Sequence, residues 1–209
     1  FFFKQKTAYE IYQCDWSSDV CSSDLLEGWR PADAVETAEA WADALKQEGP
    51  SVLCLSRQNL KPVRTEAASE NLSARGGYVV REAAEPKVIL IATGSEVEIA
   101  LDVAGRLEGE GIAARVVSLP NWRRFEAQDA TYREAVLPTV GPDEILRVSI
   151  EAGTTFGWER LTMVQGLRFG IDGFGASAPA KDLYDHFGLT AEKIAPQIVS
   201  ALRSRPRSS

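Results

Sequence analysis

Apolar and polar residues alternate along residues 78–203 in a pattern that predicts short strands followed by helices. Compact apolar runs typical of buried strands are found at YVV, KVILIAT, AARVVSLP, EILRVSIEAG and LRFGID. Apolar residues at helical spacing predict helices over GSEVEIALDVAGRLEGEG, DATYREAVL, GWERLTM, SAPAKDLYDHFG and TAEKIAPQIVSALR. Because strands alternate with helices, we expect an α/β fold with a mainly parallel, doubly wound sheet.

A second α/β pattern precedes this one, in residues 26–60. Residues 31–46 carry apolar side chains at helical spacing, and Asp33 stands where a capping residue is expected. The run SVLCLS, residues 51–56, predicts a buried parallel strand. Since no strand pattern stands before the helix, we expect residues 26–60 to be the end of a larger α/β domain, with an unpaired strand edge.

Polar segments separate these parts. Residues 61–77 lack a period and end in Gly76-Gly77, which predicts a linker. Residues 204–209, SRPRSS, predict a frayed tail. We therefore expect a domain over residues 78–203.

The first 25 residues follow neither a helical nor a strand period. They include Cys14 and Cys21, but a zinc site needs a second ligand pair, and only Cys54 and His186 remain for it. The letters KQKTAYEI and DWSSDVCSSDL resemble a translated sequencing adapter. We interpret residues 1–25 as a disordered or artefactual tail and expect the natural sequence to begin near Leu26.

Charge and composition exclude some classes of function. The chain has 23 basic and 30 acidic residues, a net charge of −7, which argues against a nucleic-acid partner. No apolar run reaches the ~18 residues that cross a bilayer, so no membrane partner is expected. Cys54 lies in an apolar run and is interpreted as a small core residue. A reducing, cytoplasmic location follows from this use of cysteine.

Ligands of open α/β sheets collect at the carboxyl ends of the strands. At one such end, Ser95 and Glu98 form the S-x-x-E pattern of a capping box, which we favour over an anion site at the same helix start. At another, Glu151 could serve as a general base, although a capping or interface role is favoured. His186, the sole histidine, precedes a glycine near a helix end, and nothing supports a catalytic role for it.

Arg57 directly follows the strand over residues 51–56. Its forked, permanently charged guanidinium suits a bidentate clamp on a phosphate or a carboxylate. A surface or interdomain salt bridge explains the same residue equally well from chemistry alone.

An ordered set of motifs adds a family resemblance. They are RPADAVETAEAW, LSRQNL, ILIATGSEV, RVVSLP, QDATYREAVLP, EAGTTFGWER and FGASAPA. From about Leu26 to about Leu202 the chain resembles the C-terminal third of a bacterial transketolase. The resemblance implies that residues 26–60 end a pyrimidine-binding domain and that residues 78–203 form the C-terminal domain.

The resemblance also implies a function for the parent protein. Transketolases transfer a two-carbon ketol unit between a phosphorylated ketose and an aldose in the pentose phosphate pathway. They use thiamine diphosphate and a divalent cation, Mg²⁺ or Ca²⁺, and work as homodimers. Arg57 matches the family arginine that contacts the sugar phosphate. No catalytic, cofactor-binding or metal-binding residue of the family carries over, so the fragment alone is expected to be inactive.

One alternative of another class remains open at this point. The chain could be a non-catalytic dimerisation or regulatory module of another thiamine-diphosphate enzyme, of the deoxyxylulose-phosphate synthase or 2-oxoacid dehydrogenase β type. A split subunit belongs to the same alternative.

Overall fold

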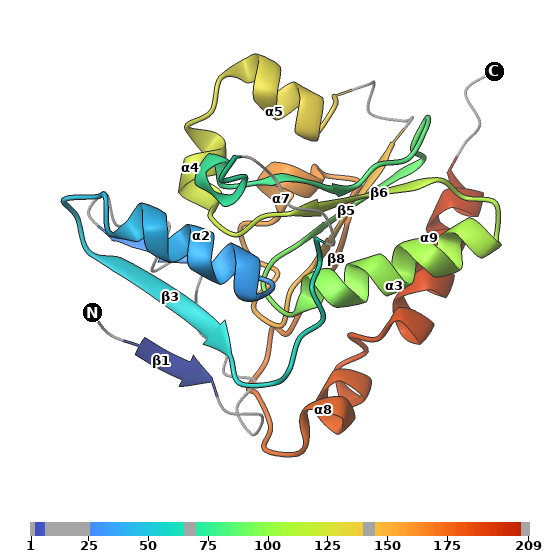
Figure 1. Ribbon diagram of the computed structural model, residues 1–209. Helices are drawn as coiled ribbons and strands as arrows, with labels where there is room; N and C mark the ends of the chain where they lie inside the picture. The colour runs from blue at the N-terminus through green and yellow to red at the C-terminus, as the bar shows by residue number, and fades with distance from the viewer. Residues whose placement is uncertain (1–2, 7–25, 65–69, 140–144, 206–209) are drawn as a thin grey trace.

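The computed structural model describes residues 3–6, 26–64, 70–139 and 145–205 (Figure 1). Its larger sheet has five strands in the order β4-β6-β5-β7-β8. They are β4 (Tyr78–Arg81), β5 (Val88–Ala92), β6 (Ala114–Ser118), β7 (Leu146–Ile150) and β8 (Leu167–Phe169). All neighbours are parallel except β4, which runs antiparallel to β6 at one edge. The mainly parallel sheet predicted from the sequence is confirmed.

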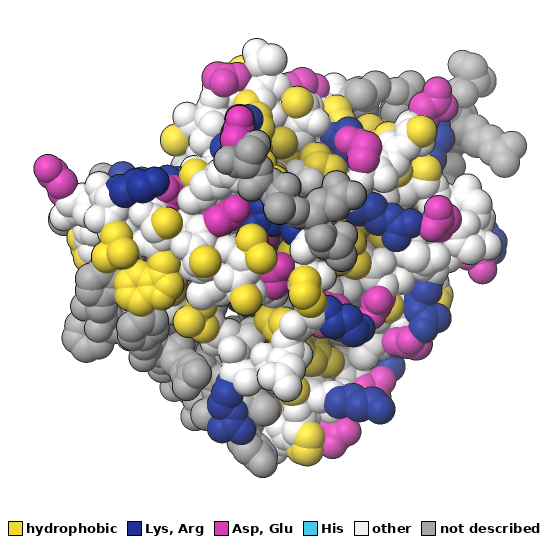
Figure 2. Space-filling view, viewed as in Figure 1, with side chains coloured by type: hydrophobic (Ala, Val, Ile, Leu, Met, Phe, Trp, Pro, Cys, Tyr) yellow, Lys and Arg dark blue, Asp and Glu magenta, His cyan; other side chains and the backbone are white. Residues whose placement is uncertain are grey.

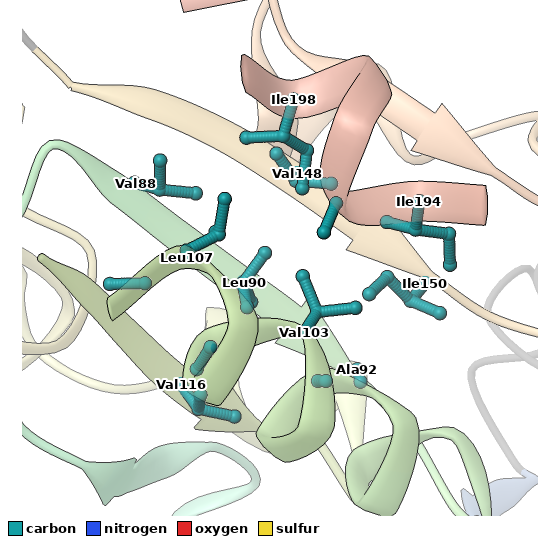
Figure 3. Close-up of a cluster of buried hydrophobic side chains, with 14 of the residues drawn as sticks. Val88, Leu90, Ala92, Val103, Leu107, Val116, Val148, Ile150, Ile194 and Ile198 are labelled. Carbon is teal, nitrogen blue, oxygen red and sulfur yellow. The ribbon is translucent and has the colours of Figure 1, made fainter. Parts of the chain in front are cut away.

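Helices cover both faces of this sheet. On one face, α3 (Glu96–Gly109) and α9 (Ala191–Ser204) pack on alternate residues of the central strands (Figure 3). On the other face lie α4 (Trp122–Glu126), α5 (Ala130–Val136) and α7 (Glu159–Thr162). Val88 and Leu90 point to the first core and Ile89 and Ile91 to the second, and all four are fully buried. The sheet is therefore doubly wound, with α8 (Ala180–His186) leading into α9.

A smaller parallel sheet precedes the linker, in the order β1-β3-β2. Its strands are β1 (Phe3–Lys6), β2 (Glu27–Trp29) and β3 (Ser51–Ser56). Between β2 and β3 lies α2 (Ala34–Ala44), and the side chain of Asp33 caps it by accepting a 2.8 Å hydrogen bond from the backbone N–H of Glu36. The predicted helix, its cap and the predicted parallel strand are confirmed.

The expected unpaired edge of β3 is wrong. β2 pairs with one side of β3 and β1 with the other. With three residues, β2 is too short to show a period in the sequence. Residues 3–6 also form a strand where no pattern predicted one, because an open strand edge offers free N–H and C=O groups to any extended backbone. Residues 7–25, with Cys14 and Cys21, lie outside the described residues.

The described part of the linker packs against α2 rather than crossing open solvent. The backbone N–H of Val63 donates to Asp33 at 2.9 Å, and Arg64 pairs with Glu39 at 2.7 Å. Ser73, in a short 3-10 turn, donates to the same Glu39 carboxylate at 2.6 Å. Gly76 follows with φ +82°, where a Cβ atom would lie 2.2 Å from the backbone nitrogen of Phe125. The described residues on either side of 65–69 thus pack against α2 and α4.

Two observations concern membrane-spanning helices and surface charge. Among the described residues, no helix is both long and apolar enough to cross a membrane. On the face seen in Figure 2, the described basic and acidic side chains are interspersed.

Candidate functional site

Arg30 joins the two sheets at their carboxyl edges. It follows β2 directly, and only 8% of the residue is exposed. Its backbone N–H donates to Pro120 at 2.8 Å, and its carbonyl accepts from Gly94 at 2.9 Å. Its guanidinium donates to the carbonyl of Thr93 at 2.7 Å. These bonds bring the end of β2 against the residues that follow β5 and β6.

Two buried carboxylates neutralise Arg30. Glu96, at the start of α3, pairs with one guanidinium nitrogen, and Glu151, after β7, lies 3.6 Å from another. Burial works against the charged form of Arg30, but the two carboxylates raise its pKa above the ordinary value. We call Arg30, Thr93, Glu96, Glu151 and Tyr184 the Arg30 cluster.

Glu96 remains ionised in this cluster. It is fully buried and accepts hydrogen bonds from the hydroxyls of Tyr184 and of Ser95, the latter at 2.7 Å. Burial alone would raise the pKa of Glu96, but Arg30 and the two hydroxyls hold it below the ordinary range. The Glu96 charge in turn adds to burial in raising the pKa of Tyr184.

The predicted capping box is therefore wrong. The side chain of Ser95 makes no capping hydrogen bond, because its hydroxyl is directed to Glu96 and lies 3.2 Å from that of Tyr184. Glu98 instead pairs with Lys61 of the linker at 2.7 Å. The space beside Gly94, considered as an anion site, holds the Arg30 side chain.

Glu151 has the interface role that its position favoured. One carboxylate oxygen accepts from the hydroxyl of Thr93 at 2.8 Å, and the other accepts from the indole N–H of Trp158 at 2.9 Å. With Arg30 also close, both oxygens are engaged by the protein. This arrangement stabilises the junction of the two sheets.

Two further clusters cross the same junction. Glu36 of α2 is fully buried and accepts from the hydroxyls of Tyr78 and Ser118, each at 2.6 Å, and from the N–H of Ala32 at 2.7 Å. Arg124 of α4 binds Glu27 at the start of β2 and Asp43 at the end of α2. The Arg124 guanidinium also lies 4.9 Å from the centre of the Trp29 ring.

Arg57 lies at the same edge of the small sheet as Arg30. It directly follows β3 and its side chain is exposed. The next three residues line a cavity of about 720 Å³, together with parts of α3, α8 and the start of α9. Ser95 and Tyr184, which both contact Glu96, belong to the same cavity wall.

The remaining candidates from the sequence lie apart from the Arg30 cluster. His186 is exposed near the end of α8. Its ring packs edge-to-face on the ring of Phe187, with 4.9 Å between the two ring centres. Cys54 is a half-buried thiol inside β3. The sequence reasoning missed Arg30 and Tyr184 as functional residues. The signal for Arg30 was its place as the first residue of the motif RPADAVETAEAW.

The described residues do not fit a diphosphate-bearing coenzyme and its metal. Within residues 3–6, 26–64, 70–139 and 145–205, no group of three or more His, Cys, Asp or Glu is placed to hold a metal ion. The buried carboxylates Glu36 and Glu151 accept hydrogen bonds from the protein itself, and Glu96 accepts hydrogen bonds at one oxygen and pairs with Arg30 at the other. The chemistry of this region is that of a packed junction.

Comparisons with known proteins identify the family. Residues 76–190 match the family model described as the transketolase-like TK C-terminal domain. A plasmid-encoded transketolase of Cupriavidus necator is 55% identical over 168 residues, which cover 80% of this chain and 24% of that protein.

Solved structures agree. The transketolase of Leishmania mexicana superposes with a TM-score of 0.78 at 40% identity, covering 90% of this chain and 27% of that one. A Pichia stipitis transketolase in complex with sedoheptulose 7-phosphate superposes with a TM-score of 0.78 at 34% identity, covering 88% and 26%. The chain spans about a quarter of the length of these relatives. It belongs to the transketolase family, and residues 76–190 are its transketolase-like C-terminal domain.

Proposed function

We propose that this chain is the C-terminal part of an enzyme that transfers a two-carbon ketol unit between phosphorylated sugars in the pentose phosphate pathway. The observation that carries the proposal is the family match over residues 76–190, supported by 55% identity to the Cupriavidus necator transketolase. The Pichia stipitis relative was solved with sedoheptulose 7-phosphate, which supports phosphorylated sugars as the substrate class. The relatives favour this function over a module of another thiamine-diphosphate enzyme.

The parent would use thiamine diphosphate with Mg²⁺ or Ca²⁺, as a cytoplasmic homodimer. When bound, this coenzyme supplies the stabilised carbanion that the transfer needs. Because the described residues do not fit it, we assign the coenzyme and the metal to parts of the parent outside those residues. The isolated chain is then catalytically inactive, and its residues contribute structure and substrate contacts.

Arg57 is the residue to which we assign a substrate contact. Arg57 is exposed and directly follows the carboxyl end of β3, and the next three residues line the cavity described above. A planar fork of N–H donors binds a phosphate monoester through two parallel hydrogen bonds. Arg57 would therefore hold the phosphate end of the sugar and leave its reacting end free.

A kinetic comparison tests the proposal. Ketol transfer from xylulose 5-phosphate to ribose 5-phosphate is measured for the 209-residue chain and for a chimera, with thiamine diphosphate and Mg²⁺ present. In the chimera, the segment of this chain that aligns with the Cupriavidus necator enzyme over 168 residues replaces its counterpart in that enzyme. We expect turnover from the chimera and none from the chain. An inactive but folded chimera contradicts the proposed function.

A further inference from the structure

We propose that Arg30 is a positioning residue through which the C-terminal domain, by way of Glu96 and Glu151, fixes the place of Arg57. The C-terminal domain would then influence substrate binding in the parent enzyme through the position of Arg57. This positioning role rests on the proposed function only for what Arg57 binds. The physical coupling between Arg30 and Arg57 is independent of that function.

The first link is the register of the small sheet. β2 and β3 are parallel, and Trp29 lies opposite Leu53. Arg30 therefore stands beside Cys54, and Arg57 follows three residues later, about 10 Å further along at ~3.3 Å per residue. The carboxyl ends of both strands lie at one edge of the sheet. Fixing the end of β2 therefore fixes the backbone from which Arg57 departs.

The second link is the wall of the cavity. The residues after Arg57, Gln58 to Leu60, line it together with Ser95 and Tyr184. The hydroxyls of Ser95 and Tyr184 both donate to Glu96, and Glu96 holds Arg30. Contacts thus run from Arg30 through Glu96 to Ser95 and Tyr184, which line the same cavity as the segment after Arg57.

A third contact holds the chain just beyond that segment. Lys61 pairs with Glu98 of α3 at 2.7 Å. The side chain of Lys61 is exposed, so we expect this ion pair to contribute little stability. The charges of the Arg30 cluster are buried, so losing one of them should cost more than losing Lys61.

The guanidinium group is specifically required for this arrangement. Arg30 reaches the Thr93 carbonyl and the carboxylates of Glu96 and Glu151 at the same time. A lysine keeps the positive charge, but its single ammonium group cannot span all three. Arg30→Lys should therefore loosen the edge without leaving the two carboxylates wholly uncompensated.

Arg124 offers a matched control. It is also an arginine that bridges two acids across the junction, Glu27 and Asp43. Glu27 is the first residue of β2, so the ion pair between Arg124 and Glu27 lies at the opposite end of that strand from Arg30. Arg124→Lys should weaken the junction at the end remote from Arg57.

Amide hydrogen exchange of the 209-residue chain tests the coupling, because protection reports local opening. In Arg30→Lys, we expect the amides of residues 54–60 to exchange about tenfold faster than in the unmodified chain. In Arg124→Lys, those amides should keep their protection. Glu151→Gln, which removes one acid of the cluster, is the milder second variant and should act in the same direction as Arg30→Lys. Unchanged protection in both Arg30→Lys and Glu151→Gln, or an equal loss in Arg124→Lys, overturns the inference.

Kinetics of the chimera test the consequence for substrate. Arg30→Lys should raise KM for xylulose 5-phosphate about tenfold, with kcat and the KM for an unphosphorylated ketose nearly unchanged. In an Arg57→Ala background the same substitution should add nothing, because it acts through Arg57. A full additional effect in that background contradicts the positioning role. An inactive unmodified chimera contradicts the proposed function instead, and the exchange experiment then still decides on the coupling.

Discussion

The hydroxyl of Tyr78 donates a 2.6 Å hydrogen bond to the buried carboxylate of Glu36, which joins the edge strand β4 to helix α2. Burial raises the pKa of Glu36 above its ordinary value even though Ser118, Tyr78 and the N–H of Ala32 donate to it. Glu96, in the Arg30 cluster, has a lowered pKa because Arg30 and the hydroxyls of Tyr184 and Ser95 together outweigh its burial. The two carboxylates therefore make the stability of the junction depend on pH in opposite directions.

Glu96→Gln tests the pH dependence of stability that we expect from the lowered pKa of Glu96. Because the folded-state pKa of Glu96 is below that of the unfolded chain, its stabilisation is fully present above the ordinary glutamate pKa of about 4.3 and is lost as pH falls through the folded value. We expect the unmodified chain to exceed Glu96→Gln by about 3 kcal/mol in free energy of unfolding at pH 7. Urea unfolding from about pH 8 to pH 3.5 should show this difference in free energy of unfolding becoming smaller only at the acidic end of the range.

Glu36→Gln should show the reverse trend. The raised pKa of Glu36 gives a contribution that is fully present below about pH 4.3 and is lost as pH rises through the folded value. The stability of the unmodified chain relative to Glu36→Gln should therefore increase as the pH is lowered toward about 4.3. If the free-energy difference from the unmodified chain changed with pH in the same direction for both variants, the result would contradict the opposite pKa shifts of Glu36 and Glu96.

Substituting two glycines should change stability with opposite signs. Gly94 has φ +56°, and a Cβ atom there would lie 2.9 Å from Cγ of Arg30, so we expect Gly94→Ala to lower the free energy of unfolding by about 1–3 kcal/mol. Gly105 lies inside α3, and a Cβ atom there would have no heavy atom within 4 Å, so Gly105→Ala should raise it by about 0.5–1 kcal/mol. Urea unfolding of both variants measures the difference. A neutral Gly94→Ala would contradict the close packing of Arg30.

Removing the small sheet should harm the rest of the chain. A chain of residues 61–209 would leave Glu96 and Glu151 without Arg30 and would uncover Tyr78 and Ser118. We expect it to give less soluble protein and to unfold at lower urea than a chain of residues 26–209. Equal yield and equal unfolding midpoints would show that the junction contributes little.

The sequence predicts those parts of the fold whose signals are local. Strand β5 is apolar on both faces, and β7 is apolar at every second residue, so these strands could be predicted. Asp33 stands at a helix start, so the cap of α2 could be predicted as well. β2 could not, because its three residues show no period and its pairing depends on β3. The role of Ser95 was predicted wrongly, since the S-x-x-E pattern is local whereas its actual neighbour Tyr184 is 89 residues away.

The contacts between the two sheets could not be predicted from the sequence for the same reason. Arg30 meets Thr93 and Glu151 only after both sheets have formed, and no spacing in the sequence encodes those distances. The position of Glu151 after a strand made it a candidate, but its partners could not be predicted. The role of Arg57 was suggested by its place after a strand and by the family resemblance, and it remains a prediction.

Arg57→Ala in the chimera tests that role directly. A charge-assisted contact with a phosphate contributes about 1.5–3 kcal/mol, so KM for phosphorylated sugars should rise roughly ten- to a hundredfold. An unphosphorylated ketose lacks the group that Arg57 would hold, so its KM should change little. Equal increases for both kinds of sugar would remove Arg57 from the phosphate site.

The central claim is that this chain completes a transketolase structurally without holding the coenzyme itself. Isothermal titration calorimetry of the 209-residue chain with thiamine diphosphate and Mg²⁺ tests it most directly. We predict no saturable heat of binding, with or without the metal. Tight, metal-dependent binding of thiamine diphosphate by this chain alone would contradict the account.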